Sequence, residues 1–272
     1  EVPEYVVTVP TPDVYAGEFQ GKDGGSRYAE CIYDALSLLK HRGIKPAAFI
    51  IDTIISSGGV VATPLGYLAK IAEVVREAGA LFVADEVQPG FGRTGRNFWG
   101  YQIDDFVPDI VTMGKPMGNG HPLAATVTRR ELVDEFAAHT SYFNTFGGNP
   151  VSCAAGLAVL DVIENEKLQE NALEVGLYLN QKLEMLSEKH EVIGDVRGEG
   201  LFKAVELVAD RAARTPATEI TADVVEGLRK HGILAGSIGK TNNILKLRPP
   251  MVFSKENAEF FIQGFDEVLC GL

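Results

Sequence analysis

Apolar residues fall in short runs through the first half of the chain, which is the pattern of buried strands. The predicted strands are 47–52, 81–84, 110–113 and 123–127. A helix is predicted near 65–78, because Leu68, Ala72 and Val75 lie on one helical face. Residues 1–26 are rich in Pro, Gly and polar side chains and predict an irregular segment. Strands that alternate with helices and loops favour an α/β fold with a mostly parallel sheet.

Longer helical patterns begin at Asn149, which followed by Pro150 predicts a capped helix of small residues. The next helix has apolar positions at spacings of four, three, four, four and three, namely Leu168, Ala172, Val175, Leu179, Leu183 and Leu186. Beyond residue 190 the predicted strands are 192–197, 201–208, 233–235 and 244–247. Helices are predicted at 219–230 and after Ser254. We therefore expect a large domain over 1–165, a connecting helix over 166–189 and a small α+β domain over 190–272.

The composition narrows the class of partner. Among 272 residues, 25 are basic and 37 are acidic, giving a net charge of -12. Nucleic acids and anionic membranes bind clustered basic residues, so neither is an expected partner, and a small molecule is. No apolar run reaches the roughly 18 residues of a membrane span. The widely spaced Cys31, Cys153 and Cys270 predict neither disulfides nor a zinc site and favour the cytoplasm.

Lys115 and Asp85 are the residues that suggest chemistry. Lys115 lies between glycines just after a predicted strand, and Asp85 ends an earlier one. In a parallel sheet both positions fall at the carboxyl edge, where ligands bind. A flexible amine can form an imine with pyridoxal phosphate (PLP), and a carboxylate can keep the pyridine nitrogen protonated. Each residue also has a plain interpretation, Lys115 as a surface lysine in a glycine-rich loop and Asp85 as a turn-initiating residue.

Two motifs carry a resemblance to a known family. The segments 84–95 (ADEVQPGFGRTG) and 114–122 (GKPMGNGHP) resemble those of class III (omega-type) PLP-dependent aminotransferases. The chain is most similar to the alanine-glyoxylate aminotransferase and ethanolamine-phosphate lyase branch, from about residue 28 onward. The resemblance implies PLP fold type I, with residues 1–165 as the latter part of the large PLP-binding domain. It also implies that the chain is a C-terminal fragment, because the family's N-terminal phosphate-binding and ring-stacking motifs are not found.

The same resemblance implies the cofactor site. Lys115 matches the Schiff-base lysine, Asp85 the partner of the pyridine nitrogen, Val87 a residue on the ring face and Gln88 a contact near the ring hydroxyl. Pro89 stands where the family usually has Thr or Ser, which we expect to change loop rigidity more than chemistry.

Two further residues are implied by the resemblance. Thr145 matches the threonine that reaches the cofactor phosphate of a neighbouring subunit, so a homodimer is expected. Its plain interpretation is a helix-capping turn before Pro150. Arg248 matches an arginine that binds a substrate carboxylate, and a planar guanidinium suits that task. A salt bridge between domains is the alternative for Arg248.

Other signals are weaker. Asp52 stands where many relatives carry Glu, so we leave it out of the expected site. Gly239-Lys240-Thr241 lacks the earlier glycine of a P-loop, and no histidine pattern or carboxylate pair predicts a metal site. The segment 197–201 is expected to be structural.

The sequence thus predicts a PLP-dependent aminotransferase. Lys115 would serve the transfer of nitrogen from an amino acid or amine donor to a keto acid or aldehyde acceptor. Two alternatives stay open: a PLP-dependent lyase acting on an amino-alcohol phosphate, and a non-catalytic fragment or module of a larger chain.

Overall fold

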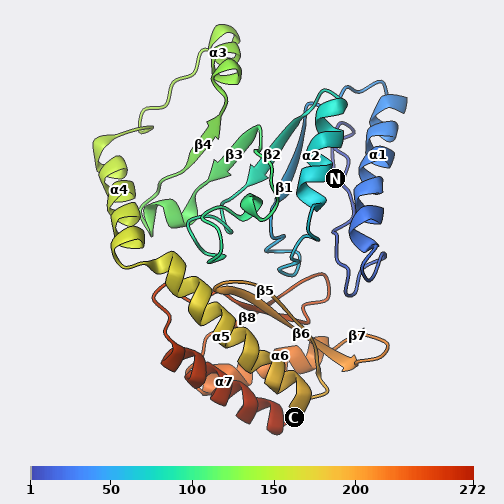
Figure 1. Cartoon of the computed structure of the whole chain (residues 1–272), viewed down its shortest axis with the longest axis vertical. Coiled ribbons are helices and arrows are strands. Elements are labelled where there is room, and N and C mark those ends of the chain that lie inside the picture. The colour runs from blue at the N-terminus through green and yellow to red at the C-terminus, as the bar shows by residue number, and fades with distance from the viewer. Residues whose placement is uncertain (1) are drawn as a thin grey trace.

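A computed structural model describes residues 2–272 and contains two sheets, which lie one above the other in Figure 1. The first has the order β1-β2-β3-β4, formed by β1 (Ala48–Asp52), β2 (Leu81–Asp85), β3 (Ile110–Met113) and β4 (Ala125–Thr128). β1, β2 and β3 are parallel and β4 is antiparallel to β3. The predicted mostly parallel sheet is therefore confirmed, although its last strand begins at Ala125 rather than at Leu123.

Two helices cover one side of this sheet (Figure 1). They are α1 (Gly24–His41) and α2 (Tyr67–Glu77). Their buried side chains pack with Phe82 and Ala84 of β2 in one apolar core. α2 was predicted, whereas α1 was not. The segment expected to be irregular was 1–26. Residues 2–23 have neither helix nor strand, but residues 24–26 already belong to α1, and Glu1 lies outside the described residues.

The chain then forms an exposed arm, defined here as residues 125–165. It consists of β4, α3 (Arg130–His139), a loop and α4 (Pro150–Asn165). α3 was not predicted, whereas the Asn149 cap of α4 is confirmed: its side chain accepts the Ser152 N–H at 3.0 Å. Figure 1 shows α3 beyond the end of β4, and α3 buries no residue. Exposed apolar side chains on the arm are Val127, Val133, Phe136, Tyr142, Phe143, Phe146, Val151, Leu157, Leu160 and Val162.

The second sheet has the order β5-β6-β9-β8 and is antiparallel throughout. Its strands are β5 (Ile193–Glu199), β6 (Phe202–Asp210), β8 (Gly236–Ile238) and β9 (Ile244–Leu247), and the short β7 (Thr215–Pro216) pairs with β6. The strand expected at 233–235 is wrong, because the chain only pairs with β9 from Gly236. Residues 233–235 instead connect the preceding helix to the sheet.

Three helices pack against this second sheet. They are α5 (Leu168–Lys189), α6 (Thr218–Lys230) and α7 (Lys255–Cys270). All three supply side chains to one core with β5, β6 and β9, and five of the six residues in the predicted apolar stripe of α5 are buried in it, while Leu168 is buried outside it. Ser254 caps α7 as predicted, accepting the Asn257 N–H at 3.2 Å. The division of the chain at residues 165 and 190 stays a prediction.

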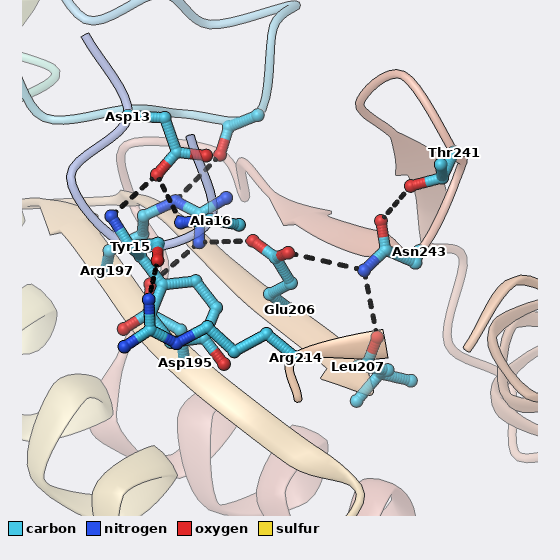
Figure 2. A network of polar contacts seen from close by, with 11 residues as sticks. Asp13, Tyr15, Ala16, Asp195, Arg197, Glu206, Leu207, Arg214, Thr241 and Asn243 are labelled. Atoms are coloured by element: carbon cyan, nitrogen blue, oxygen red, sulfur yellow. Dashed lines mark hydrogen bonds and ion pairs between the residues drawn. The ribbon is translucent and has the colours of Figure 1, made fainter. Parts of the chain in front are cut away.

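The loop that follows β1 joins the two sheets. Ile54 and Val60 from this loop pack with Phe202 and Ile244 of the second sheet. Arg197 on β5 donates from Nε to the Gly59 carbonyl at 3.0 Å. Its Nη1 donates to Asp195 and Glu206, both at 2.7 Å, as Figure 2 shows. These contacts of Arg197 fit the structural role expected for segment 197–201.

The helices of residues 2–272 include none with both the length and the apolar character that crossing a bilayer requires.

Candidate active site

The ends of the first three strands bring the proposed residues to one edge of the sheet. Asp85 is the last residue of β2 and pairs in register with Asp52 of β1 and Thr112 of β3. Lys115 follows β3 by two positions. The parallel pairing therefore puts Asp85 and Lys115 at the same carboxyl edge, as the sequence predicted.

Lys115 opens a short 3₁₀ helix, η2 (Lys115–Gly118), with an exposed side chain. Its φ of 36° lies in the left-handed region, which is unusual for a residue other than glycine. Such strain costs on the order of 1–3 kcal/mol and clusters at functional sites. Val87 lies beside this turn, because its Cγ2 is 3.9 Å from the point where a Cβ on Gly114 would stand.

Asp85 is half-buried, and its two oxygens differ. Oδ1 accepts the Val87 N–H at 3.1 Å, which is what a turn-initiating aspartate does. Within the described residues we find no donor on Oδ2. The carboxylate thus fixes the turn that carries Val87 and retains one acceptor for a ligand.

Gln88 connects the two sheets at this edge. Its Oε1 accepts from Lys246 Nζ at 3.0 Å and from Arg248 Nη1 at 3.1 Å, both on the strand β9 side of the molecule. Its Nε2 donates to Ser56 Oγ and, at 3.4 Å, to Ser57 Oγ. One amide therefore gathers two hydroxyls and two cations, and these five residues are called the Gln88 cluster below.

Lys246 was missed by the sequence reasoning. The signal was present, since residues 246 and 248 are two apart in an extended segment and point to the same side. Burial, followed by the charges of Arg248 and Lys115, lowers the pKa of Lys246, while Asp52 opposes the shift. The influence of Lys115 means that its amine belongs to the same electrostatic neighbourhood. Residues 2–272 include no ion pair to Arg248, so the salt-bridge interpretation of Arg248 finds no support.

Two further carboxylates lie under the site. Asp52 accepts from the backbone N–H of Ser56 at 2.9 Å and from its hydroxyl. Burial raises the pKa of Asp52, with a smaller contribution from Asp85. Glu86 is fully buried and accepts from Thr53 Oγ1 at 2.8 Å and from the Gly100 N–H at 2.7 Å. Burial also raises the pKa of Glu86. The hydrogen bonds of both acids hold the loops that follow the strand ends.

Arg93, in the loop that follows β2, directs a third cation toward the second sheet. Its Nη1 donates to the backbone carbonyls of Leu201, at 3.3 Å, and Pro249. Burial and the nearby Arg248 charge lower the pKa of Arg93 to about 10. This excess of positive charge around Arg248 suits an anionic ligand.

Thr145 is not joined to these side chains. It is exposed in the loop between α3 and α4. The segment around it ends in the turn that caps α4 through Asn149, so the plain interpretation of this segment as a helix-capping turn also fits the structure.

The residues present fit PLP. Asp85 has an open carboxylate oxygen, Val87 an apolar surface next to the Lys115 turn, and Lys115 an accessible amine. These are an acceptor for the ring nitrogen, a face for the ring and a nucleophile for the aldehyde.

Comparison with known proteins agrees with this geometry. The family model described as "Aminotransferase class-III" matches residues 2–269. The chain is 50% identical over 255 residues to alanine-glyoxylate aminotransferase 2 homolog 2, mitochondrial, of Arabidopsis thaliana, covering 94% of this chain and 52% of that protein. The chain therefore spans about half the length of this relative.

Solved structures give the same family. A phospholyase from Arthrobacter in complex with phosphoethanolamine superposes with a TM-score of 0.93 at 40% identity, covering 98% of this chain and 63% of that one. A PLP-bound amine transaminase from an uncultivated Pseudomonas species gives a TM-score of 0.86 at 31% identity over 96% of this chain and 60% of that one. The expected fold and family, including the branch with aminotransferases and phospholyases, are confirmed. The chain belongs to the class III aminotransferase family, whose cofactor is PLP.

Proposed function

We propose that this chain is the part of a PLP-dependent aminotransferase that carries the catalytic lysine, Lys115. The observation that supports this most is the meeting of the Gln88 cluster with the Asp85–Val87 turn beside Gly114. A nucleophilic amine, a carboxylate and two cations are thereby brought to one edge of the first sheet. The reaction moves an amino group from an amino acid or amine to a keto acid or aldehyde.

Each residue has a defined task in this proposal. PLP supplies an electron sink for the carbon that loses its proton. Lys115 Nζ holds the cofactor and then carries the proton from the substrate carbon. Asp85 keeps the ring nitrogen protonated, Val87 packs on a ring face and Gln88 lies near the ring hydroxyl. Arg248, together with Lys246, holds the anionic group of the substrate.

We also propose a homodimer in which Thr145 reaches the cofactor phosphate of the partner. The exposed arm supports this, because Phe143 is 84% and Phe146 79% exposed on either side of Thr145. Large apolar patches on a soluble protein mark interaction surfaces. For the compartment we favour the cytoplasm, since all three cysteines are free, although the Arabidopsis relative is named mitochondrial.

Trapping the cofactor tests the role of Lys115. The protein is incubated with PLP, reduced with borohydride, digested and analysed by mass spectrometry. We expect the modified peptide to contain Lys115, and the label to vanish in Lys115→Ala but not in Lys240→Ala, an exposed lysine. Full-length protein that labels elsewhere, or not at all, would contradict the proposal and favour a non-catalytic module.

A phospholyase activity is the second candidate. A phosphate monoester carries up to two negative charges, and Lys246, Arg248, Ser56 and Ser57 offer two cations and two hydroxyls to it. The likeness to a phospholyase bound to phosphoethanolamine supports the same candidate. Full-length protein would be given phosphoethanolamine and, separately, alanine with glyoxylate. Phosphate release without nitrogen transfer would replace the first proposal by the second.

A further inference from the structure

A cluster of metal-ligating side chains lies far from the candidate active site, where the end of α5 meets α7. His190 directly follows α5, and Asp266 and Cys270 are one turn apart on α7. His190 Nε2 is 2.6 Å from Asp266 Oδ1, and Cys270 Sγ is 4.0 Å from the same oxygen. One potential ligand atom from each residue lies within 4.8 Å of the others.

The scaffold holds these residues firmly. Leu186 of α5 and Leu269 of α7 are buried in the core shared by the two helices. The His190 backbone N–H donates to the Leu186 carbonyl at 2.8 Å. The His190 side chain is only 10% exposed, so its ring is directed at Asp266 rather than at solvent.

We propose that His190, Asp266 and Cys270 form a zinc site that fastens the end of α5 to the last helix. Imidazole nitrogen, carboxylate oxygen and thiolate sulfur are all zinc ligands, and three protein ligands leave one position for water. The ion takes the place of the proton between His190 Nε2 and Asp266 Oδ1, and this proton is released to solvent. The Cys270 thiol releases its proton to solvent as the metal–sulfur bond forms.

The distances require small movements only. Zinc bonds of about 2.0–2.3 Å at tetrahedral angles put neighbouring ligand atoms about 3.4–3.6 Å apart. The His190–Asp266 pair must therefore separate by about 0.8 Å and the Cys270–Asp266 pair approach by about 0.4 Å. The ligand atoms of His190 and Cys270 lie within 4.8 Å and must approach by at most about 1.2 Å. Side-chain rotation supplies these movements.

Lys189 sets a limit on the affinity. Its Nζ lies 2.7 Å from both oxygens of Asp266, so the ammonium competes with a cation. Metal on Oδ1 leaves Oδ2 for Lys189, which then acts on the ligand from outside the metal shell. An ion pair among His190, Lys189 and Asp266 is the simpler alternative, and it makes no use of Cys270.

Metal titration of the 272-residue chain separates the two. After chelator treatment, Zn²⁺ is added in competition with a chromophoric indicator, and Co²⁺ is added separately to detect thiolate-to-cobalt absorption. We expect one zinc per chain, with affinity falling about tenfold or more in Cys270→Ser, which also loses the cobalt–thiolate band. Cys153→Ser is the matched control, an exposed cysteine outside the cluster, and should change neither.

A second readout does not depend on the indicator. Zinc should raise the melting temperature of the wild type and of Cys153→Ser but not of Cys270→Ser, because a ligand stabilises the state that binds it. Lys189→Gln should bind zinc more tightly, since it removes the competing charge. Absence of binding, or binding and cobalt absorption unchanged in Cys270→Ser, would overturn the zinc site.

Discussion

The carboxylate of Asp104 stabilises the start of α2, and its removal gives a quantitative test of the fold. It accepts the N–H groups of Gly66 at 2.7 Å and Leu68 at 2.8 Å, and that of Ala69 at 3.3 Å. Loss of a helix cap costs about 1 kcal/mol, and a buried N–H left unpaired costs about 1–3 kcal/mol. Leu68 is fully buried, whereas Gly66 is exposed and Ala69 is half-buried, so the penalty for an unpaired donor falls mainly on the Leu68 N–H. Asp104→Ala should therefore lower the free energy of unfolding by about 2–4 kcal/mol.

Urea unfolding followed by the fluorescence of Trp99, the single tryptophan, measures this change. Asp104→Asn keeps one acceptor oxygen and should lose about half as much. The adjacent Asp105 is exposed, so Asp105→Ala is the control and should change the free energy by less than about 0.5 kcal/mol. An equal loss in the two alanine variants would refute the assignment of the cap to Asp104.

Three further outcomes can be measured. Phe265→Ala should cost about 3–5 kcal/mol in urea unfolding, because Phe265 is fully buried, whereas Phe260→Ala, at a residue 59% exposed, should cost little. Although burial opposes the shift, hydrogen bonds from Phe82 and Arg76 lower the pKa of Asp109 below 3.8. The ionised Asp109 therefore stabilises the folded state fully above that pH, and this stabilisation is lost as the pH falls through the folded-state pKa. Asp109→Asn should accordingly flatten the acid limb of stability against pH, and an unchanged limb would contradict this. Lys246→Met should weaken inorganic phosphate binding about tenfold by calorimetry, while Lys230→Met, at an exposed residue, should not.

The sequence predicted elements whose pattern was long or whose motif was specific. The apolar stripe of α5 and the Ser254 cap of α7 emerged because each depends on residues close in the chain. α1 was missed although Ala29, Ile32 and Leu39 repeat at helical spacing, because the Pro- and Gly-rich residues before it suggested irregular structure. α3 was missed too, although Leu132, Val133 and Phe136 lie at helical spacing, because the helix has only 10 residues and buries none of them.

The candidate site shows the same limit. Asp85, Val87 and Lys115 could be proposed from the sequence because motifs and strand ends are local features. The contacts of Gln88 with Lys246 and Arg248 join residues about 160 positions apart, and only the folded chain brings them together. His190 and Asp266 were likewise invisible to a search for metal ligands at short spacing, since 76 residues separate them.

The loop after β1 has a consequence for how this molecule can be divided. Ile55 and Val60 both adopt left-handed φ angles, which β-branched residues resist, so local preference alone does not hold the loop in this shape. Its contacts to Arg197 and Phe202 come from the other sheet. A truncated protein that ends after α5 would let the loop relax, and Ser56 would leave Gln88. The two halves therefore cannot be exchanged independently between homologues. A chimera with another C-terminal half should keep the contacts of this loop with Arg197 and Phe202.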